Sequence, residues 1–233
     1  MEDALTVPSR FCGPIGAANG GYLAGLLAAR LGGEAEVTFR RSVPLERALI
    51  VEARDDAGLV LREGGTVLAD AVRTSVDLIL PARVTLAEAE AGARRFPRFD
   101  GHPIPGCFVC GPAREVGDGL RIFPGPVEGR DVIAAPWTPA ASLAGSDGAT
   151  RPEFVWAALD CAGAFAVNEP PRGLALLGRI AARVVGRVDV GAPCVVVGWS
   201  LGAEGRKLYA GTAVFSARGA LCAAARATWI LVR

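Results

Sequence analysis

Residues 20–31 read Gly20-Gly-Tyr-Leu-Ala-Gly-Leu-Leu-Ala-Ala-Arg-Leu31, and Gly32-Gly33 follow directly. The run predicts a helix that ends at the glycine pair, a common helix stop. It is apolar almost all round, and such a helix is normally buried. A second apolar run predicts another buried helix at Phe154–Val167. The residues that introduce it, Thr150-Arg-Pro-Glu153, are typical of a capping box with proline in the first turn.

After each predicted helix come apolar segments rich in β-branched residues and bounded by glycine and charged turns. In the first half they are Leu45–Leu61 and, after Gly64-Gly65, Thr66–Leu80; in the second half they are Gly191–Leu201, Leu208–Ser216 and Leu221–Val232. Because no helix separates these segments within a half, they favour antiparallel sheets. We therefore expect an α+β fold in which two curved sheets each wrap one long helix and join edge to edge.

This approximate repeat predicts an N-terminal unit at 1–85, a linker at 86–117 and a C-terminal unit at 118–233. The chain has 233 residues and a formal net charge of +1, which gives no electrostatic case for nucleic acid or an anionic membrane surface. The first residues lack the pattern of a secretory leader, and no apolar run approaches the roughly 20 residues that span a bilayer. We expect a cytoplasmic protein without membrane insertion. In a reducing compartment, the six scattered cysteines favour buried thiols over a disulfide framework.

Two short motifs point to a known superfamily. Asn19-Gly20-Gly21-Tyr22-Leu23-Ala24 resembles the start of the central helix in many hotdog-fold thioesterases. Gly106-Cys-Phe-Val-Cys-Gly111, followed by Gly119-Leu-Arg-Ile-Phe123, resembles the opening of several small hotdog thioesterases. The chain is thus similar to double-hotdog acyl-CoA thioesterases of the thioesterase II type. The resemblance implies hydrolysis of an acyl-CoA or acyl-carrier thioester without a cofactor. Since one chain already supplies both halves, association into a homo-oligomer is optional.

Asp160 is the most informative single position. It is the only charged residue between Trp156 and Phe165. A buried carboxylate is costly unless it is paired or hydrogen-bonded, so it is usually retained for a purpose. The resemblance implies that Asp160 is catalytic and orients or activates the attacking water. The alternative is a structural ion pair with a buried arginine, Arg179 or Arg183, that braces the two halves.

The start of the first helix is the predicted substrate-binding site. Backbone N–H groups at Asn19, Gly20, Gly21 and Tyr22 suit a thioester carbonyl oxygen, and glycine permits close approach. The alternative is a helix N-cap followed by glycines that allow tight packing, with Tyr22 in the core or along an acyl tunnel. Glu153 is a second, weaker catalytic candidate, as a general base, because a capping-box role explains it fully.

Cys107-x-x-Cys110 and nearby His102 raise the question of a metal. A structural zinc site commonly uses two such cysteine pairs, and the sequence holds only one, so we expect neither a metal nor a redox cofactor. The resemblance also implies polar partners for the aspartate at Leu177–Arg179 and Ala225–Thr228. Only Thr228 carries a hydroxyl there, and the chain has no glutamine, so the polar set of the resembling enzymes is incomplete.

Two alternatives to hydrolysis stay open because of this gap. One is a non-catalytic acyl-CoA-binding protein on the same fold. The other is an enoyl-CoA hydratase-like enzyme, which would need an Asp/His pair, whereas His102 lies in the predicted linker.

Overall fold

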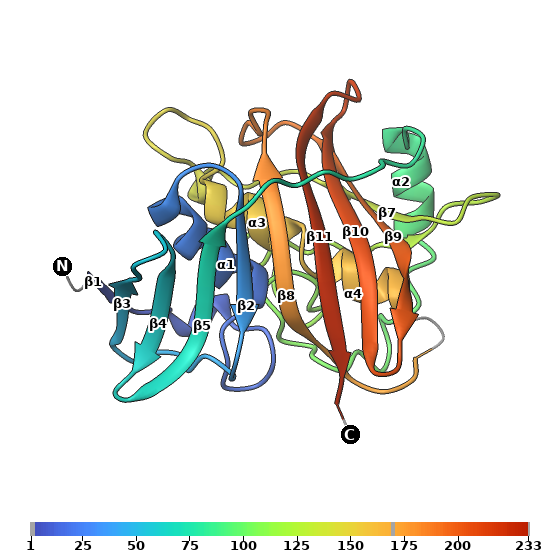
Figure 1. The fold of residues 1–233 in the computed structure, drawn as a ribbon. Helices are drawn as coiled ribbons and strands as arrows, with labels where there is room; N and C mark the ends of the chain where they lie inside the picture. Colours follow the sequence, from blue (N-terminus) through green and yellow to red (C-terminus); the bar gives the residue numbers. More distant parts are fainter. Residues whose placement is uncertain (1–2, 169–170, 233) are drawn as a thin grey trace.

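Among the residues that the structure describes, one antiparallel sheet of 11 strands organises the fold (Figure 1). The computed structural model describes residues 3–168 and 171–232. The first half contributes β1 (Asp3–Leu5), β2 (Ala35–Phe39), β3 (Leu49–Ala53), β4 (Leu59–Glu63) and β5 (Thr66–Arg73). The second half contributes β6 (Gly125–Pro126), β7 (Ile133–Trp137), β8 (Ala175–Val184), β9 (Cys194–Glu204), β10 (Lys207–Ser216) and β11 (Leu221–Leu231). The strand order is β1-β3-β4-β5-β2-β8-β11-β10-β9-β7-β6.

The two halves join through β2 and β8, which pair antiparallel from Ala35↔Ala182 to Thr38↔Arg179. This confirms that the two sheets meet edge to edge and form one surface. Neither β2 nor β8 is among the strands that the sequence predicts. Ala35 and Val37 are buried, so β2 presents a short alternating pattern to the core. Joining the halves removes two open sheet edges, which are otherwise prone to pair with other chains.

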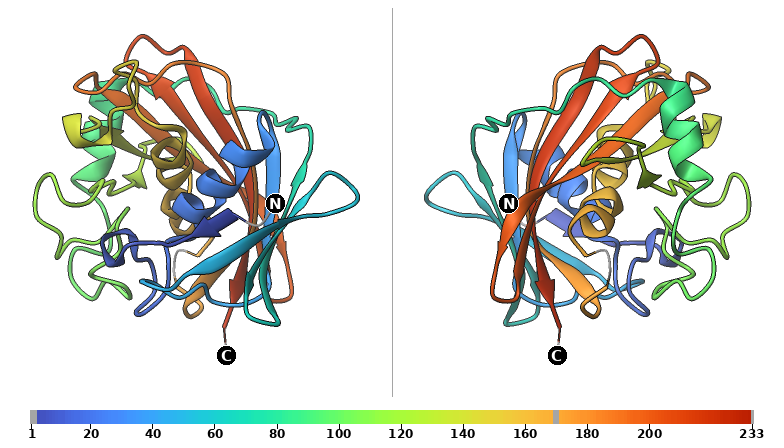
Figure 2. Two further views of the ribbon diagram at one scale, coloured as in Figure 1. Left: turned by 90° about the vertical axis from the view of Figure 1, so that its left-hand side faces the viewer. Right: turned by 90° about the vertical axis from the view of Figure 1, so that its right-hand side faces the viewer.

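The helices α1 (Gly20–Leu31), α3 (Pro152–Ala158) and α4 (Cys161–Val167) lie on one face of the sheet (Figure 2). The larger cluster of buried side chains fills the space between these helices and the sheet. The first predicted helix is confirmed at both ends. Asn19 caps it, because its side-chain oxygen accepts a hydrogen bond from the Tyr22 N–H at 2.9 Å.

The second predicted helix is wrong in its continuity. The stretch Phe154–Val167 forms α3 and α4, which are separated by a turn at Leu159 and Asp160. The predicted capping box is also wrong. Arg151 occupies the N-cap position and makes no side-chain capping bond, although Pro152 does begin the helix. The Thr150 hydroxyl is buried without a hydrogen-bond partner among the described residues.

The opposite face of the sheet is covered at one end by α2 (Leu86–Ala93). The segment that follows β5 crosses this outer face and leads to α2 (Figure 1). A second, smaller cluster of buried residues lies beneath, where Ala89 packs with Val195 and Val197 of β9. Short 3-10 turns occur at Ser9–Phe11 and Ala141–Leu143. The division of the chain at residues 85 and 117 stays a prediction. Within the described ranges, every helix is too short or too polar to cross a membrane.

Candidate functional site

Asp160 lies where α3 ends and α4 begins. The Thr212 hydroxyl of β10 donates a hydrogen bond of 2.8 Å to the carbonyl oxygen of Leu159. In a continuous helix that oxygen would accept a hydrogen bond from the Gly163 N–H. Here the Gly163 N–H donates instead to the backbone carbonyl oxygen of Asp160, at 3.0 Å. Asp160 consequently leaves helical geometry, with φ −76° and ψ −81°. The break turns its side chain toward the start of α1.

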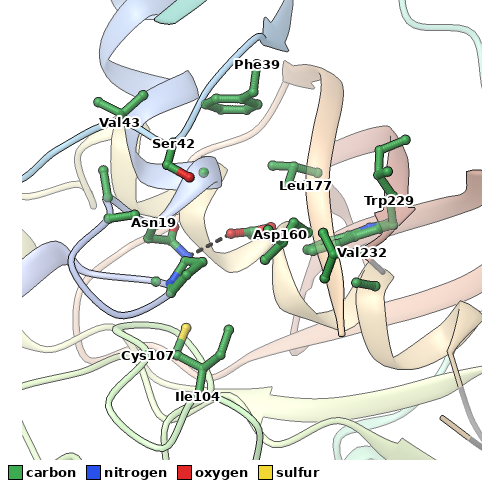
Figure 3. A pocket seen from close by; sticks show the side chains of 18 of the residues that line it. Asn19, Phe39, Ser42, Val43, Ile104, Cys107, Asp160, Leu177, Trp229 and Val232 are labelled. Carbon is green, nitrogen blue, oxygen red and sulfur yellow. Dashed lines mark hydrogen bonds between the residues drawn. The ribbon is translucent and has the colours of Figure 1, made fainter. Parts of the chain in front are cut away.

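One carboxylate oxygen of Asp160 is held by two donors from the start of α1. Oδ2 accepts from Asn19 Nδ2 at 2.7 Å, the dashed line in Figure 3, and from the Gly21 N–H at 3.1 Å. Asn19 has both ends of its amide engaged, because its oxygen caps α1 while its nitrogen contacts the aspartate. The other oxygen, Oδ1, is buried and accepts no hydrogen bond from the described residues. The structure thus joins predicted site residues from the two halves of the chain.

Glycine is required for this contact between α1 and α3. A Cβ atom on Gly21 would lie 2.7 Å from the Asp160 Cβ and 2.7 Å from the Trp156 carbonyl oxygen. A Cβ atom on Gly25, one turn later, would lie 2.5 Å from the Glu153 Cα. Real Cβ atoms do not approach other atoms so closely, so the Gly21-x-x-x-Gly25 spacing lets the helix backbones meet. The close approach brings the Gly21 N–H within reach of Asp160.

The environment favours the neutral form of Asp160. Burial, and next the charge on the Cys107 sulfur, raise the pKa of Asp160 from 3.8 to about 7, although the bonds from Gly21 and Asn19 lower it. Asp160 is 3% exposed. No arginine of the described residues pairs with it, so the alternative of a bracing ion pair is wrong. Arg179 pairs with Glu36 at 3.4 Å, and the Nε of Arg183 has no partner there.

A cavity of about 260 Å³, which we call the Asp160 cavity, opens beside this carboxylate (Figure 3). Its walls are mainly apolar: Phe39, Val43, Ile104, Leu177, Trp229 and Val232. Gly20 also lines it, and the Gly20 N–H donates no hydrogen bond to any described residue. The Trp229 indole N–H is likewise buried and unpaired. The residues that line this mainly apolar cavity thus include polar groups without partners among the described residues, a feature of ligand-binding sites.

A second cavity of about 220 Å³, the Phe165 cavity, shares Ile104, Cys107, Cys161 and Trp229 with the first. His102, Ala164, Phe165, Pro171 and Leu174 complete its wall. Three buried thiols, those of Cys107, Cys110 and Cys161, line this second cavity. The thiols of Cys110 and Cys161 hold the pKa of the Cys107 thiol well below its usual value.

No family model matches the chain, and no curated protein matches it. Its structure is nevertheless similar to solved structures over nearly its full length. A tesB protein of Mycobacterium avium subspecies paratuberculosis is 14% identical with a TM-score of 0.65, covering 100% of this chain and 93% of that chain. A conserved protein of unknown function with a hot dog fold, from Alicyclobacillus acidocaldarius, is 11% identical with a TM-score of 0.65 and the same coverage. An acyl-CoA thioesterase II of Mycobacterium marinum is 14% identical with a TM-score of 0.62, covering 98% and 92%.

This chain has a double-hotdog fold. The architecture that the sequence predicts is therefore confirmed. Because the identities are 14% or lower, the likeness shows the fold alone, and the chemistry must be argued from the residues.

Within the double hotdog, three of the six predicted site residues line the Asp160 cavity, whereas Gly21, Tyr22 and Glu153 do not. Asn19, Gly20 and Asp160 line the Asp160 cavity. Tyr22 instead stacks on Phe11, with ring centroids 4.1 Å apart, and burial raises the pKa of Tyr22 to about 12. Glu153 is buried at the start of α3, 3.4 Å from Arg151, and lines neither cavity. Tyr22 and Glu153 thus lie in the core behind the cavity wall.

The resemblance implies polar partners for Asp160 on two strands, at Leu177–Arg179 and Ala225–Thr228, and the structure differs from this expectation. Leu177 lines the Asp160 cavity and offers no polar group. Ala227 and Trp229 belong to the core on the helix side, so the intervening Thr228 lies on the outer face. The hydroxyl close to Asp160 comes instead from Thr212, which the sequence did not single out. Its one signal is a threonine inside the otherwise apolar run Ala210–Phe215.

Proposed function

We propose that this protein hydrolyses an acyl thioester, with Asp160 activating the attacking water. The carrying observation is the geometry of its carboxylate. One oxygen is fixed by Asn19 and Gly21, while the other has no partner among the described residues, in a side chain that lines an apolar cavity. A carboxyl group whose pKa lies near 7 accepts and returns a proton efficiently at neutral pH. Thioesterase II neighbours share the fold, which supports this class of substrate.

The proposed step uses groups at one end of the Asp160 cavity. The water oxygen attacks the thioester carbonyl carbon while the Asp160 carboxylate accepts the water proton. The negative charge then develops on the carbonyl oxygen, where the free Gly20 N–H at the start of α1 stabilises it. As the C–S bond breaks, the leaving thiolate takes the proton back from Asp160. The products are a carboxylic acid and a free thiol.

The mouth of the cavity suits the nucleotide part of coenzyme A. Arg41 and Ser42 are exposed residues that line the cavity, and the Arg41 guanidinium makes no ion pair with any described residue. A free arginine is well suited to a phosphate group. We assign the acyl group to the apolar wall formed by Leu177 and Trp229.

The test is a thiol-release assay with acyl-CoA substrates of increasing chain length. The proposal expects turnover in the wild type and a fall of roughly 10²–10⁴-fold in Asp160→Asn, the usual contribution of a general base. Tyr209→Phe serves as a matched control, because Tyr209 bonds Glu204 at the surface and lines neither cavity. Equal turnover of Asp160→Asn and wild type would contradict the proposal.

A second function, acyl-CoA binding without hydrolysis, is favoured by one observation. Thr228 lies on the outer face, so the polar set implied by the resemblance is not reproduced around Asp160. A binding protein would retain acyl-CoA in equilibrium dialysis and release no thiol at any chain length. The hydratase-like alternative finds no comparable support, since His102 does not line the Asp160 cavity.

A further inference from the structure

Three cysteine thiols converge from two distant parts of the chain. Cys107 and Cys110 lie in the loop that precedes β6, and Cys161 is the first residue of α4. Their sulfur atoms all lie within 4.8 Å of one another, and the Cys107 and Cys161 sulfurs are 3.7 Å apart. All three residues are buried, with at most 7% of their surface exposed. The sequence shows only the Cys107-x-x-Cys110 pair, and the fold supplies the third thiol.

The first two thiols lie in a tight turn. The Gly111 N–H closes the turn by donating to the Cys107 carbonyl oxygen at 2.9 Å. A Cβ atom on Gly111 would lie 2.4 Å from the Pro105 carbonyl oxygen, so only glycine fits there. The turn holds the Cys107 and Cys110 sulfurs within 4.8 Å of each other.

We propose that Cys107, Cys110 and Cys161 bind one thiophilic metal ion, Zn²⁺, through three thiolates. Zinc–sulfur bonds of about 2.3 Å in a tetrahedral arrangement place sulfur atoms roughly 3.8 Å apart. The Cys107–Cys161 distance of 3.7 Å matches this value, and the remaining sulfur needs only a small shift. Three soft thiolates with no hard oxygen ligand favour Zn²⁺ over Mg²⁺ or Ca²⁺.

His102 is excluded as the fourth ligand by its own hydrogen bond. Its Nδ1 accepts from the Ile104 N–H at 3.0 Å, so in the neutral ring Nε2 carries the proton and offers no lone pair. The fourth position therefore faces the Phe165 cavity, which all three cysteines line. Three protein ligands and one exchangeable position is an arrangement that binds water or a small donor ligand. The proposed metal site adjoins the Asp160 cavity, whose wall includes Cys107 and Cys161, but its metal binding can be tested without thioester turnover.

The test uses the full chain, reduced and stripped with a chelator, then titrated with Co²⁺ and afterwards with Zn²⁺. We expect one equivalent of Co²⁺ to bind and to give a near-ultraviolet thiolate-to-cobalt band with the intensity of three thiolates. Zn²⁺ should then displace the cobalt. Cys110→Ser and Cys161→Ser should each weaken binding more than about 100-fold, because removing even an outer-shell partner costs 10–100-fold. Cys194→Ser, in the buried start of β9, is the matched control and should bind as the wild type does.

Circular dichroism spectra show whether each variant is folded. If a serine variant unfolds, the wild-type titration alone decides, because its band intensity counts the thiolate ligands. The proposal is overturned if the folded wild type takes up no stoichiometric metal, or if folded Cys161→Ser retains the band and the affinity. Thioester turnover is not a readout, so failure here leaves the proposed hydrolysis untouched.

Discussion

Replacing Asp160 with asparagine should remove activity and at the same time stabilise the fold at alkaline pH. The pKa of Asp160 rises from 3.8 to about 7 on folding, mainly through burial. At 1.36 kcal/mol for each pKa unit, the shift of about three units corresponds to roughly 4 kcal/mol of stability lost when the group is ionised. The penalty is absent below pH 3.8, grows between about pH 4 and 7, and is complete above pH 7.

Asparagine recovers most of that penalty. The asparagine side-chain oxygen can accept hydrogen bonds from Asn19 and Gly21, which in the wild type both donate to Oδ2 of Asp160. Its NH₂ group would occupy the Oδ1 position, which contacts no donor or acceptor of the described residues, and an unpaired buried group costs about 1–3 kcal/mol. The net expectation is a variant about 1–3 kcal/mol more stable than the wild type at pH 8, with that advantage lost near pH 4.

The measurement is urea denaturation of reduced, chelator-treated wild type and variant at pH 4.5 and pH 8, alongside the thiol-release assay. Removing metal matters because Cys107 also contributes to the pKa of Asp160. A variant that is less stable than the wild type at pH 8 would show that the ionised carboxylate braces the structure. A variant with full turnover would refute the catalytic role. Only loss of turnover together with retained or increased stability supports the proposal.

Three further substitutions test the surroundings of the carboxylate. Gly21→Ala should lose about 1–3 kcal/mol in urea denaturation and at least 10-fold in turnover, because its Cβ would lie 2.7 Å from the Asp160 Cβ. Gly65→Ala, where a Cβ meets nothing within 4 Å, should change stability by less than ~0.5 kcal/mol. Arg41→Ala should raise KM for acyl-CoA by ~5-fold, about 1 kcal/mol. It should leave KM unchanged for an acyl-pantetheine substrate, which lacks the nucleotide part. The control, Arg218→Ala, should change neither KM value. Thr212→Val removes the hydroxyl bond to the Leu159 carbonyl and should cost about 1–3 kcal/mol, with a fall in kcat at nearly constant KM.

The sequence predicted the overall architecture because hydrophobic periodicity and glycine positions are local signals. The first helix was predicted at its true ends, since Asn19 and Gly32-Gly33 mark them in the sequence. The junction strands were missed for two different reasons. β2 is only five residues long, and β8 is an apolar run whose periodicity does not distinguish helix from strand. Their pairing depends on tertiary context, which no local window contains.

The starts of α2 and α3 carry the same capping pattern in the sequence but are capped differently in the structure. Thr150-Arg-Pro-Glu153 was predicted as a capping box, yet Thr150 makes no such bond. A true capping box forms at Thr85 and Glu88, at the start of α2, where the predicted linker begins. Both stretches share the threonine and glutamate spacing, so the motif alone does not decide. At α3 the start of the helix is buried against α1, and packing at Gly25 fixes the position of Glu153.

The helix break and the candidate catalytic group have one physical cause. Aspartate is a poor residue inside a helix, yet the sequence analysis singled out Asp160 only for its charge in an apolar run and continued the predicted helix to Val167. In the structure the helix ends before Asp160, because the Thr212 hydroxyl donates to the Leu159 carbonyl oxygen. The Asp160 side chain then accepts hydrogen bonds from Asn19 and Gly21. A continuous helix would have left the same carboxylate along the helix side, without donors from the other half of the chain. The position of the Asp160 carboxylate therefore depends on a hydroxyl from β10, some 50 residues further along the chain, and this long-range contact is why sequence patterns found the aspartate but not its setting.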